Sequence, residues 1–289
     1  MKSLLFPRGR AIGARSEKYL FGLHDGFAIE TVLIRRHDGY TACISSQVGC
    51  AFGCVFCASG RAGLKRNLTR EEIVAQVTSI ERRVNRIVFM GIGEPLNNYD
   101  NVLAAIRTLR DRNGPNISSR AITLSTIGIP KGLVRLREEH LAINLTVSLH
   151  ATTQSSRARL IPGAAKHRLE DVVGASSSWA RRHARPVTFA YVLLPGLNDH
   201  PDDARRLRRM LANQPARVNL MRWNRVDGAR LDRTRVRSLA VFSRELERGG
   251  VPVVVRDTQG TDTDAACGQL WLKDLNGHRI GRSNMRVAT

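Results

Sequence analysis

The chain has 289 residues, of which 42% are apolar, and its 46 Lys and Arg residues exceed its 25 Asp and Glu residues, which gives a formal net charge of +21. This composition excludes a disordered or fibrous chain and indicates a soluble globular protein that can bury a sizeable core. Only six of the basic residues are lysines, so arginine carries the excess charge and indicates a polyanionic partner, with nucleic acid favoured over a membrane surface.

The N-terminus has one short uncharged stretch, Ser3 to Phe6, which is too short for the core of a signal peptide. The uncharged run 39–60 is long enough to span a bilayer, but its polar residues and four cysteines are typical of a loop. We therefore expect a cytoplasmic protein without a transmembrane helix.

Short apolar runs alternate with longer amphipathic stretches from Ala42 onward. The predicted strands are 42–45, 86–90, 121–125, 144–149, 187–193, 217–221 and 251–255. The predicted helices are 69–84, 101–110, 131–139, 169–182, 201–212 and 235–248. Each strand is followed by a helix, which requires parallel strands joined by right-handed crossovers.

This order predicts an α/β fold, a partial (βα)6 barrel with one core domain at residues 29–270. Residues 1–28 and 271–289 are expected to form short basic N- and C-terminal extensions. The active site of such a fold lies at the C-terminal ends of the strands. Several polar or glycine-rich segments of this chain fall there.

Three of the five cysteines, Cys50, Cys54 and Cys57, form the pattern C-x3-C-x2-C in a glycine-rich loop. Three thiolates on one loop can hold three irons of a [4Fe-4S] cluster and leave the fourth iron open. A structural zinc site needs a fourth ligand, and neither a second C-x2-C pair nor an adjacent His is present. The odd number of cysteines argues against a disulfide framework. Zinc, and buried thiols that bind nothing, stay open as alternatives.

This cysteine pattern, with Phe56 before the last cysteine, resembles that of the radical S-adenosylmethionine (SAM) superfamily, in which SAM chelates the open iron. The neighbouring sequence resembles the RlmN and Cfr family of radical SAM RNA (adenine) methyltransferases, in register from about Ile29 to Leu270. The segments that carry the resemblance are Cys43-Ile44-Ser45-Ser46-Gln47-Val48-Gly49-Cys50, Arg66-Asn67-Leu68-Thr69, Met90-Gly91-Ile92-Gly93-Glu94-Pro95-Leu96, Leu124-Ser125-Thr126, Ser148-Leu149-His150-Ala151, Tyr191-Val192-Leu193-Leu194 and Asp264-Ala265-Ala266-Cys267-Gly268-Gln269-Leu270.

The resemblance implies a role for each matching residue. Cys267 would carry an S-methylcysteine intermediate, Cys43 would be the resolving thiol that forms a transient disulfide with it, and Glu30 would be the proton acceptor. Cys50, Cys54 and Cys57 would bind the cluster. The residues implied to bind SAM are Gly93, Glu94, Ser125, Ser148, Leu149, His150 and Asn224. Taken singly, each of these would be an ordinary loop or core residue.

The implied reaction is methylation of carbon 2 or carbon 8 of an adenine in ribosomal or transfer RNA. These carbons are electron-poor, so the implied route uses two equivalents of SAM, one to methylate Cys267 and one that is cleaved reductively at the cluster. A reductant of the flavodoxin or ferredoxin type would supply electrons. Two alternatives remain: a radical methylase of a small nucleoside or secondary metabolite, and a noncatalytic iron-sulfur or zinc RNA-binding protein. The charge of +21 argues against the first, and the presence of Cys43, Cys267 and Glu30 together argues against the second.

The sequence also departs from the family. Only 42 residues precede Cys43, so we expect the helical N-terminal accessory domain of longer members to be missing or reduced, and RNA recognition to depend on the barrel and the basic ends. Ala190, Arg225 and Gly163 stand where many relatives have other residues. The sequence therefore leaves open which RNA is methylated, at which adenine carbon, and in which oligomeric state.

Overall fold

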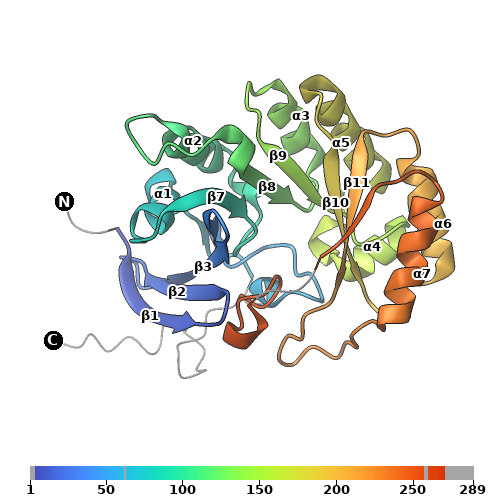
Figure 1. Cartoon of the computed structure of the whole chain (residues 1–289), viewed down its shortest axis with the longest axis horizontal. Helices are drawn as coiled ribbons and strands as arrows, with labels where there is room; N and C mark the ends of the chain where they lie inside the picture. The colour runs from blue at the N-terminus through green and yellow to red at the C-terminus, as the bar shows by residue number, and fades with distance from the viewer. Residues whose placement is uncertain (1–3, 62, 257–259, 271–289) are drawn as a thin grey trace. The chain divides into compact units, whose positions relative to one another are not determined.

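The computed structural model describes residues 4–61, 63–256 and 260–270 (Figure 1). The chain divides into two compact units. Among the described residues, unit 1 contains 4–51, 58–122 and 260–270, and unit 2 contains 52–57 and 123–256. The predicted cluster loop contributes to both, because Cys50 belongs to unit 1 whereas Cys54 and Cys57 belong to unit 2. The predicted C-terminal tail at 271–289 lies outside the described residues.

The sheet of unit 1 is mainly antiparallel. Its strands, in spatial order, are β1 (Phe6–Ile12), β2 (Ser16–Gly22), β3 (Ala28–Arg36), β4 (Gly39–Cys43) and β7 (Val84–Phe89). The pairs β1–β2, β2–β3 and β3–β4 are antiparallel, and β4–β7 is parallel. No strand was predicted before residue 42, because β1 is mostly exposed and carries no apolar alternation.

Two short strands and two helices complete the frame of unit 1. Strand β5 (Gln47–Val48) pairs with β6 (Arg66–Asn67), so the segment that carries the three cysteines leaves and returns through one antiparallel pair. Helix α1 (Arg70–Thr78) packs on α2 (Tyr99–Arg110). The described residues of unit 1 also form the short 3-10 helices η1 (Ala58–Gly60), η2 (Pro95–Asn98), η3 (Ser119–Ala121) and η5 (Thr261–Thr263).

Helix α1 shows both a correct and an incorrect boundary of the prediction. Thr69 and Glu72 form a capping box at its start, with a hydrogen bond from Glu72 N to Thr69 Oγ1 (3.2 Å) and one from Thr69 N to Glu72 Oε2 (2.9 Å). The predicted end at residue 84 is wrong, because the helix stops at Thr78. Ile80 and Val84 are buried, so the apolar pattern continues beyond the helix although the chain has already turned toward β7.

Unit 2 is built on parallel strands. In spatial order they are β8 (Ile122–Thr126, which begins at the unit boundary), β9 (Asn144–Ser148), β10 (Val187–Leu193), β11 (Ala216–Arg222) and β12 (Val253–Val255). Its helices are α3 (Pro130–Glu138), α4 (Gln154–Leu160), α5 (Leu169–His183), α6 (Pro201–Leu211) and α7 (Val236–Glu247), with a 3-10 helix η4 (Pro162–Ala164). Helix α3 packs on α5 and α6 packs on α7 (Figure 1). Every residue of the central strand β10 is buried, as expected for a parallel strand covered on both faces.

The predicted α/β class with parallel strand and helix units is confirmed, and β10 has the predicted bounds. The seven-residue helix α4 was not predicted. Within the described part of the chain, β12 is followed by the 3-10 helix η5 and by no α-helix, so the prediction that a helix of the core repeat follows every strand is wrong there. Among the same residues, no helix combines the length and the apolar character needed to cross a bilayer.

Candidate active site

Hydrogen bonds join the segments that follow the C-terminal ends of β4 and β7 and fix the backbone of both. Ile92 N donates to Ser45 Oγ (3.0 Å), and Glu94 N donates to Gln47 Oε1 (2.8 Å). A Cβ atom on Gly93, whose φ is +106°, would lie 2.6 Å from Gln47 Cβ, so only glycine fits this position without strain. Glu94 is buried and accepts a hydrogen bond from Leu96 N (3.0 Å). The two predicted SAM-binding residues Gly93 and Glu94 are thus fixed by the segment that follows Cys43.

Gln76 of α1 ties the same segment to β3. Its Oε1 accepts hydrogen bonds from Thr31 Oγ1 (2.9 Å) and Ser45 N (2.8 Å), and its Nε2 donates to Ser45 O (2.8 Å). All three groups are buried, so each of these bonds satisfies a polar group that water cannot reach. The sequence did not reveal Gln76, because its role depends on two partners far from it in the chain.

The register of β2, β3 and β4 places the proposed acid-base and thiol groups on one face of the sheet. Val32 of β3 lies opposite both Lys18 of β2 and Cys43 of β4. Directly opposite residues project to the same face, and Glu30, two residues before Val32, projects to that face as well. Thr31, which reaches Gln76 of α1, projects to the other face. Glu30 and Cys43 therefore lie on the face that α1 does not cover.

Glu30 is 1% exposed and forms an ion pair with Lys18, with Nζ 3.1 Å from Oε1. Its backbone carbonyl accepts a hydrogen bond from Ser45 Oγ (2.7 Å). A buried carboxylate is costly unless it is paired, and the Lys18 ammonium group supplies a positive charge close to Glu30. The family resemblance pointed to Glu30, whereas no local pattern in the sequence marks Lys18.

The segment around Cys267 is held on both sides of the cysteine. Before it, Asp264 O accepts a hydrogen bond from Lys18 Nζ (3.5 Å). After it, Gly268 O accepts from Ala58 N (2.7 Å), and Leu270 O accepts from Ser59 Oγ (2.8 Å). Cys267 itself is exposed. Since Ala58 directly follows Cys57, the Cys267 segment is bonded to the residue next to the last cysteine of the cluster motif.

Unit 2 brings the remaining predicted SAM-binding residues to one edge of its sheet. Ser125 lies near the end of β8, Ser148 ends β9, Leu149 and His150 follow β9, and Asn224 follows β11. These strands are parallel, so all five residues lie at the C-terminal edge, where sequence analysis expected them. Ala190, one of the departures from the family, offers its carbonyl to Leu149 N (3.1 Å) and His150 N (3.4 Å).

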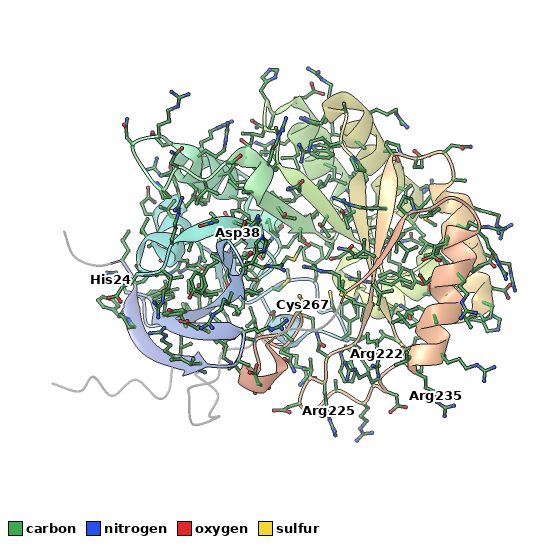
Figure 2. The ribbon with its side chains drawn as sticks, viewed as in Figure 1. His24, Asp38, Arg222, Arg225, Arg235 and Cys267 are labelled. Atoms are coloured by element: carbon green, nitrogen blue, oxygen red, sulfur yellow. The ribbon has the colours of Figure 1, made fainter. Side chains whose placement is uncertain are left out.

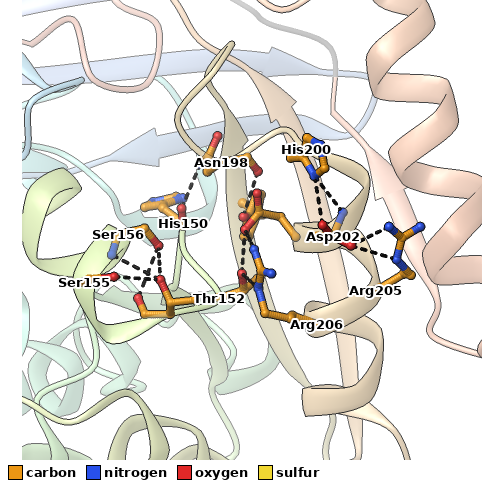
Figure 3. Close-up of polar contacts among 12 residues, drawn as sticks. His150, Thr152, Ser155, Ser156, Asn198, His200, Asp202, Arg205 and Arg206 are labelled. Carbon is orange, nitrogen blue, oxygen red and sulfur yellow. Dashed lines mark hydrogen bonds and ion pairs between the residues drawn. The ribbon is translucent and has the colours of Figure 1, made fainter.

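His150 has a fixed orientation in a strained backbone conformation, with φ at 55°. Val192 N donates a hydrogen bond to His150 Nδ1 (3.0 Å), and Asn198 Nδ2 donates to His150 O (2.8 Å; Figure 3). The acceptor role of Nδ1 places the ring hydrogen on Nε2. Burial, with a smaller contribution from Arg157, lowers the pKa of His150 to about 3. The ring is therefore neutral.

A polar cluster on α6 supports the segment after His150. Thr152 Oγ1 donates to Asp203 Oδ1 (2.7 Å), and the Arg206 guanidinium donates to both Asp203 Oδ1 (2.7 Å) and Thr152 Oγ1 (3.1 Å), as Figure 3 shows. Asn198 Nδ2 also donates to Val192 O (2.7 Å). These bonds hold the β9 and β10 ends together.

Residues 52–57 of the cysteine loop are anchored to the rest of unit 2 by four contacts. Val55 N donates to Leu160 O (3.1 Å), and Trp223 Nε1 donates to Phe56 O (3.0 Å). The Phe56 ring stands edge-on to His150, with centroids 4.8 Å apart. Gly163, another departure from the family, donates its N–H to Phe52 O (3.0 Å). The aromatic residue of the cysteine motif thus packs on a predicted SAM-binding residue.

An arginine-rich loop follows Asn224 between β11 and α7. Five arginines between 225 and 237 are exposed, against two aspartates in the same range. The base of the loop is fixed, since buried Thr234 donates to Leu193 O (2.7 Å) and accepts at its carbonyl from Arg222 Nε (2.9 Å). Arg225 and Arg235 lie on this loop in Figure 2. The loop therefore presents positive charge beside the C-terminal edge of the unit 2 sheet.

The cysteine loop fits an iron-sulfur cluster by the chemistry of its donors. Cys50, Cys54 and Cys57 are all half-buried, and a Cβ atom on Gly49, at φ +75°, would lie 2.0 Å from Gly63 O, so the backbone closes tightly behind the first cysteine. Among the described residues, no three His, Cys, Asp or Glu side chains are already gathered as a metal site. The five cysteines, all of them described, form no disulfide, so a resident Cys43–Cys267 disulfide is not supported.

Comparison with known proteins agrees with this arrangement. The model of the radical SAM superfamily matches residues 44–207. A protein of Rhodopseudomonas palustris (strain BisB5), named probable RNA methyltransferase, is 70% identical over 273 residues, which cover 94% of this chain and 76% of the relative. The dual-specificity RNA methyltransferase RlmN of Pelobacter propionicus is 44% identical over 260 residues, which cover 89% of this chain and 75% of the relative. The crystal structure of a radical SAM methyltransferase from Sphaerobacter thermophilus matches with a TM-score of 0.90 and 39% identity, over 93% of this chain and 81% of that one.

The parallel strands and the three-cysteine loop, together with these matches, define a radical SAM enzyme. The chain belongs to the RlmN-type RNA methyltransferases of that superfamily. The predicted family is thereby confirmed. Membership implies a [4Fe-4S] cluster and SAM as cofactors.

Proposed function

We propose that this RNA methyltransferase methylates carbon 2 or carbon 8 of an adenine in ribosomal or transfer RNA, through an S-methylcysteine on Cys267. The observation that carries the proposal is the shared sheet face of Glu30 and Cys43, together with the contact of Lys18 with both Glu30 and the Cys267 segment. Binding of RNA alone would require none of these groups.

RNA as the substrate is supported by the relatives' names and by charge. Both curated relatives are named RNA methyltransferases. The net charge of +21 and the exposed arginines between 225 and 237 suit a phosphate backbone, whereas a small nucleoside needs no such extended positive surface.

Cofactor binding would be divided among the described residues by their chemistry. Cys50, Cys54 and Cys57 would hold the cluster, the buried Glu94 carboxylate suits the SAM ammonium group, and the polar residues at the unit 2 edge suit the rest of the SAM molecule. When bound, the cluster and SAM would supply the methyl group and the radical chemistry that an electron-poor carbon requires.

The remaining steps would fall to three side chains of this chain. The Cys267 thiolate accepts the methyl group, and one hydrogen atom of that group would be lost to the radical that SAM supplies. The methylene carbon would then bond to the adenine, and the unpaired electron of the adduct would return to the cluster. The Glu30 carboxylate takes the proton from that adenine carbon. The Cys43 thiolate then attacks the Cys267 sulfur, the sulfur–sulfur bond forms, and the sulfur–carbon bond breaks, its electron pair leaving with the carbon, which is protonated to a methyl group.

This sequence of steps leaves Cys43 and Cys267 oxidised, so each turnover would consume electrons. A flavodoxin or ferredoxin type protein could supply them, and two equivalents of SAM would be used. We place the reaction in the cytoplasm, since a reducing compartment keeps the five cysteines as thiols.

The test is a denaturing gel of labelled RNA incubated anaerobically with cluster-loaded enzyme, SAM and a reductant. We expect Cys43→Ala to accumulate a covalent protein–RNA species, because no thiol can attack the Cys267 sulfur. Glu30→Gln should stall at the same species, because the adenine carbon keeps its proton. Cys267→Ala should lose methyl transfer altogether, including the first step.

Each variant is compared with wild type for iron content, so that a lost cluster is not mistaken for a lost step. If Cys43→Ala turns over at the wild-type rate and forms no covalent species, the mechanism is wrong. If free adenosine is methylated and RNA is not, the substrate assignment is wrong.

A further inference from the structure

Lys18 is the one residue of β2 that contacts both the proposed proton acceptor and the segment of the proposed methyl carrier in the described structure. Its Nζ lies 3.1 Å from Glu30 Oε1 and donates to Asp264 O at 3.5 Å. The Lys18 side chain is 14% exposed and that of Glu30 is 1% exposed. An ion pair this deeply enclosed differs from the surface pairs of the chain, which contribute little.

The sheet register explains why Lys18 can reach both groups. Lys18 lies opposite Val32, one diagonal step from Glu30, and Val32 lies opposite Cys43. Lys18, Glu30 and Cys43 therefore project from three neighbouring strands to one face. A lysine stem spans the diagonal distance and leaves the ammonium group at the edge where the Cys267 segment passes.

The Cys267 segment is attached to β2 and to the turn before it by more than this lysine. Ser16 Oγ and Thr263 Oγ1 lie 3.2 Å apart, and Ala14 N donates to Asp262 Oδ2 (2.8 Å). These contacts hold residues 262 and 263 near β2 without Lys18. Among these three contacts, that of Lys18 with Asp264 is the nearest to Cys267 in the sequence, and Lys18 alone also holds Glu30.

We propose that Lys18 is a positioning residue, which holds the Glu30 carboxylate in place to take the proton from the adenine carbon and ties it to the segment that carries Cys267. This inference rests on the proposed function of Glu30 and Cys267. In the step concerned, the proton passes to a Glu30 oxygen and the electron pair of the C–H bond stays in the adenine ring. The ammonium group of Lys18 favours the anionic carboxylate, which is the form that can accept a proton.

The test separates the first methyl transfer from the release of the covalent species. Lys18→Met keeps the length of the side chain and removes its charge. We expect the rate of Cys267 methylation, measured by mass spectrometry of the Cys267 peptide, to stay within about twofold of wild type. The rate at which the protein–RNA species is released should fall by about 10- to 100-fold. Lys18→Arg should restore most of the release rate, since it restores a cation. Lys131→Met, at an exposed lysine of α3, is the matched control and should behave as wild type.

A double-mutant cycle tests whether Lys18 acts through Glu30. Because Glu30→Gln already stalls release, the cycle is measured on stability rather than on the release rate. This readout needs no cofactor: the urea midpoint of the protein should fall in Lys18→Met, which leaves a buried carboxylate without its cation, and should recover in the double variant. This midpoint measurement keeps the inference testable even if Lys18→Met is poorly folded.

Three outcomes would overturn the inference. The first is release of the protein–RNA species by Lys18→Met at the wild-type rate. The second is an additive effect of Lys18→Met and Glu30→Gln on the urea midpoint. Equal loss of Cys267 methylation and release, without rescue by Lys18→Arg, would show a merely structural lysine. If Cys43→Ala and Glu30→Gln also form no covalent species, the proposed function itself fails. If those two variants accumulate the covalent species while Lys18→Met releases it at the wild-type rate, only the role of Lys18 is removed.

Discussion

Acid should destabilise this protein through His150. Burial lowers the pKa of its ring from the ordinary 6.5 to about 3 in the folded state. Above pH 6.5 the ring is neutral whether the chain is folded or unfolded, so its contribution to stability is fully present there. Below pH 6.5 the His150 ring binds a proton in the unfolded chain but not in the folded protein, so the free energy of unfolding falls until the pH reaches the folded pKa.

The size of the effect follows from the two pKa values. One pKa unit corresponds to about 1.4 kcal/mol, so the whole shift corresponds to about 5 kcal/mol of unfolding free energy. About 2 kcal/mol of that should be lost by about pH 5. Protonation of Nδ1 would also break the hydrogen bond from Val192 N, which is the local reason why the folded protein resists the proton.

The assay compares wild type with His150→Asn by urea unfolding at about pH 7.5 and about pH 5. Asparagine does not titrate, its side-chain oxygen can accept the Val192 N–H, and it tolerates a positive φ. Wild type should lose about 2 kcal/mol more than the variant between the two pH values. His167 and His183, whose pKa values burial also lowers, contribute equally to both proteins and cancel. The reasoning is refuted if both proteins lose the same free energy, or if nitrogen NMR shows the His150 ring titrating near pH 6.

Three further outcomes are expected. Anaerobic reconstitution should give about four irons per chain, and Ala at Cys50, Cys54 or Cys57 should abolish iron binding; stoichiometric zinc without iron would contradict the cluster. The logarithm of RNA affinity should fall with the logarithm of salt by roughly 0.7 to 0.9 per phosphate, and Arg235→Gln should reduce that slope by about one such step; an unchanged slope in a filter-binding titration would remove Arg235 from the RNA surface. Gln76→Leu should lower the free energy of unfolding by about 3 to 5 kcal/mol in urea, because three buried hydrogen bonds are lost at once; a loss below about 1 kcal/mol would show that the network matters little.

The parallel half of the fold was predictable because its strands are short buried runs between amphipathic helices. Strand β10 is buried throughout and was predicted with its observed bounds. The antiparallel strands β1, β2 and β3 were not predicted, although β3 contains the β-branched residues Ile29, Thr31, Val32 and Ile34, which favour a strand. Alternation was hidden there because both faces of β3 are covered over most of its length.

The site was predictable only where a local motif or a family resemblance marked it. Cys50, Cys54 and Cys57 stand out by spacing alone. Gln76, Lys18 and Asn198 have no such signal, because each becomes important through partners that the fold brings from elsewhere in the chain, as when Asn198 reaches His150 across 48 positions. Local sequence cannot report a hydrogen bond that depends on the pairing of strands.

The pairing of β3 with β4 decides whether the proposed reaction has its groups on one face. A slip of one residue would turn Glu30 and Cys43 to opposite sides of the sheet, since side chains alternate along a strand. The bond from Ser45 Oγ to Glu30 O, at 2.7 Å, and the bonds of Gln76 to Thr31 and Ser45 fix that pairing immediately beyond Cys43. Ser45 and Gln76 therefore fix the register on which the proposed roles of Glu30 and Cys43 depend.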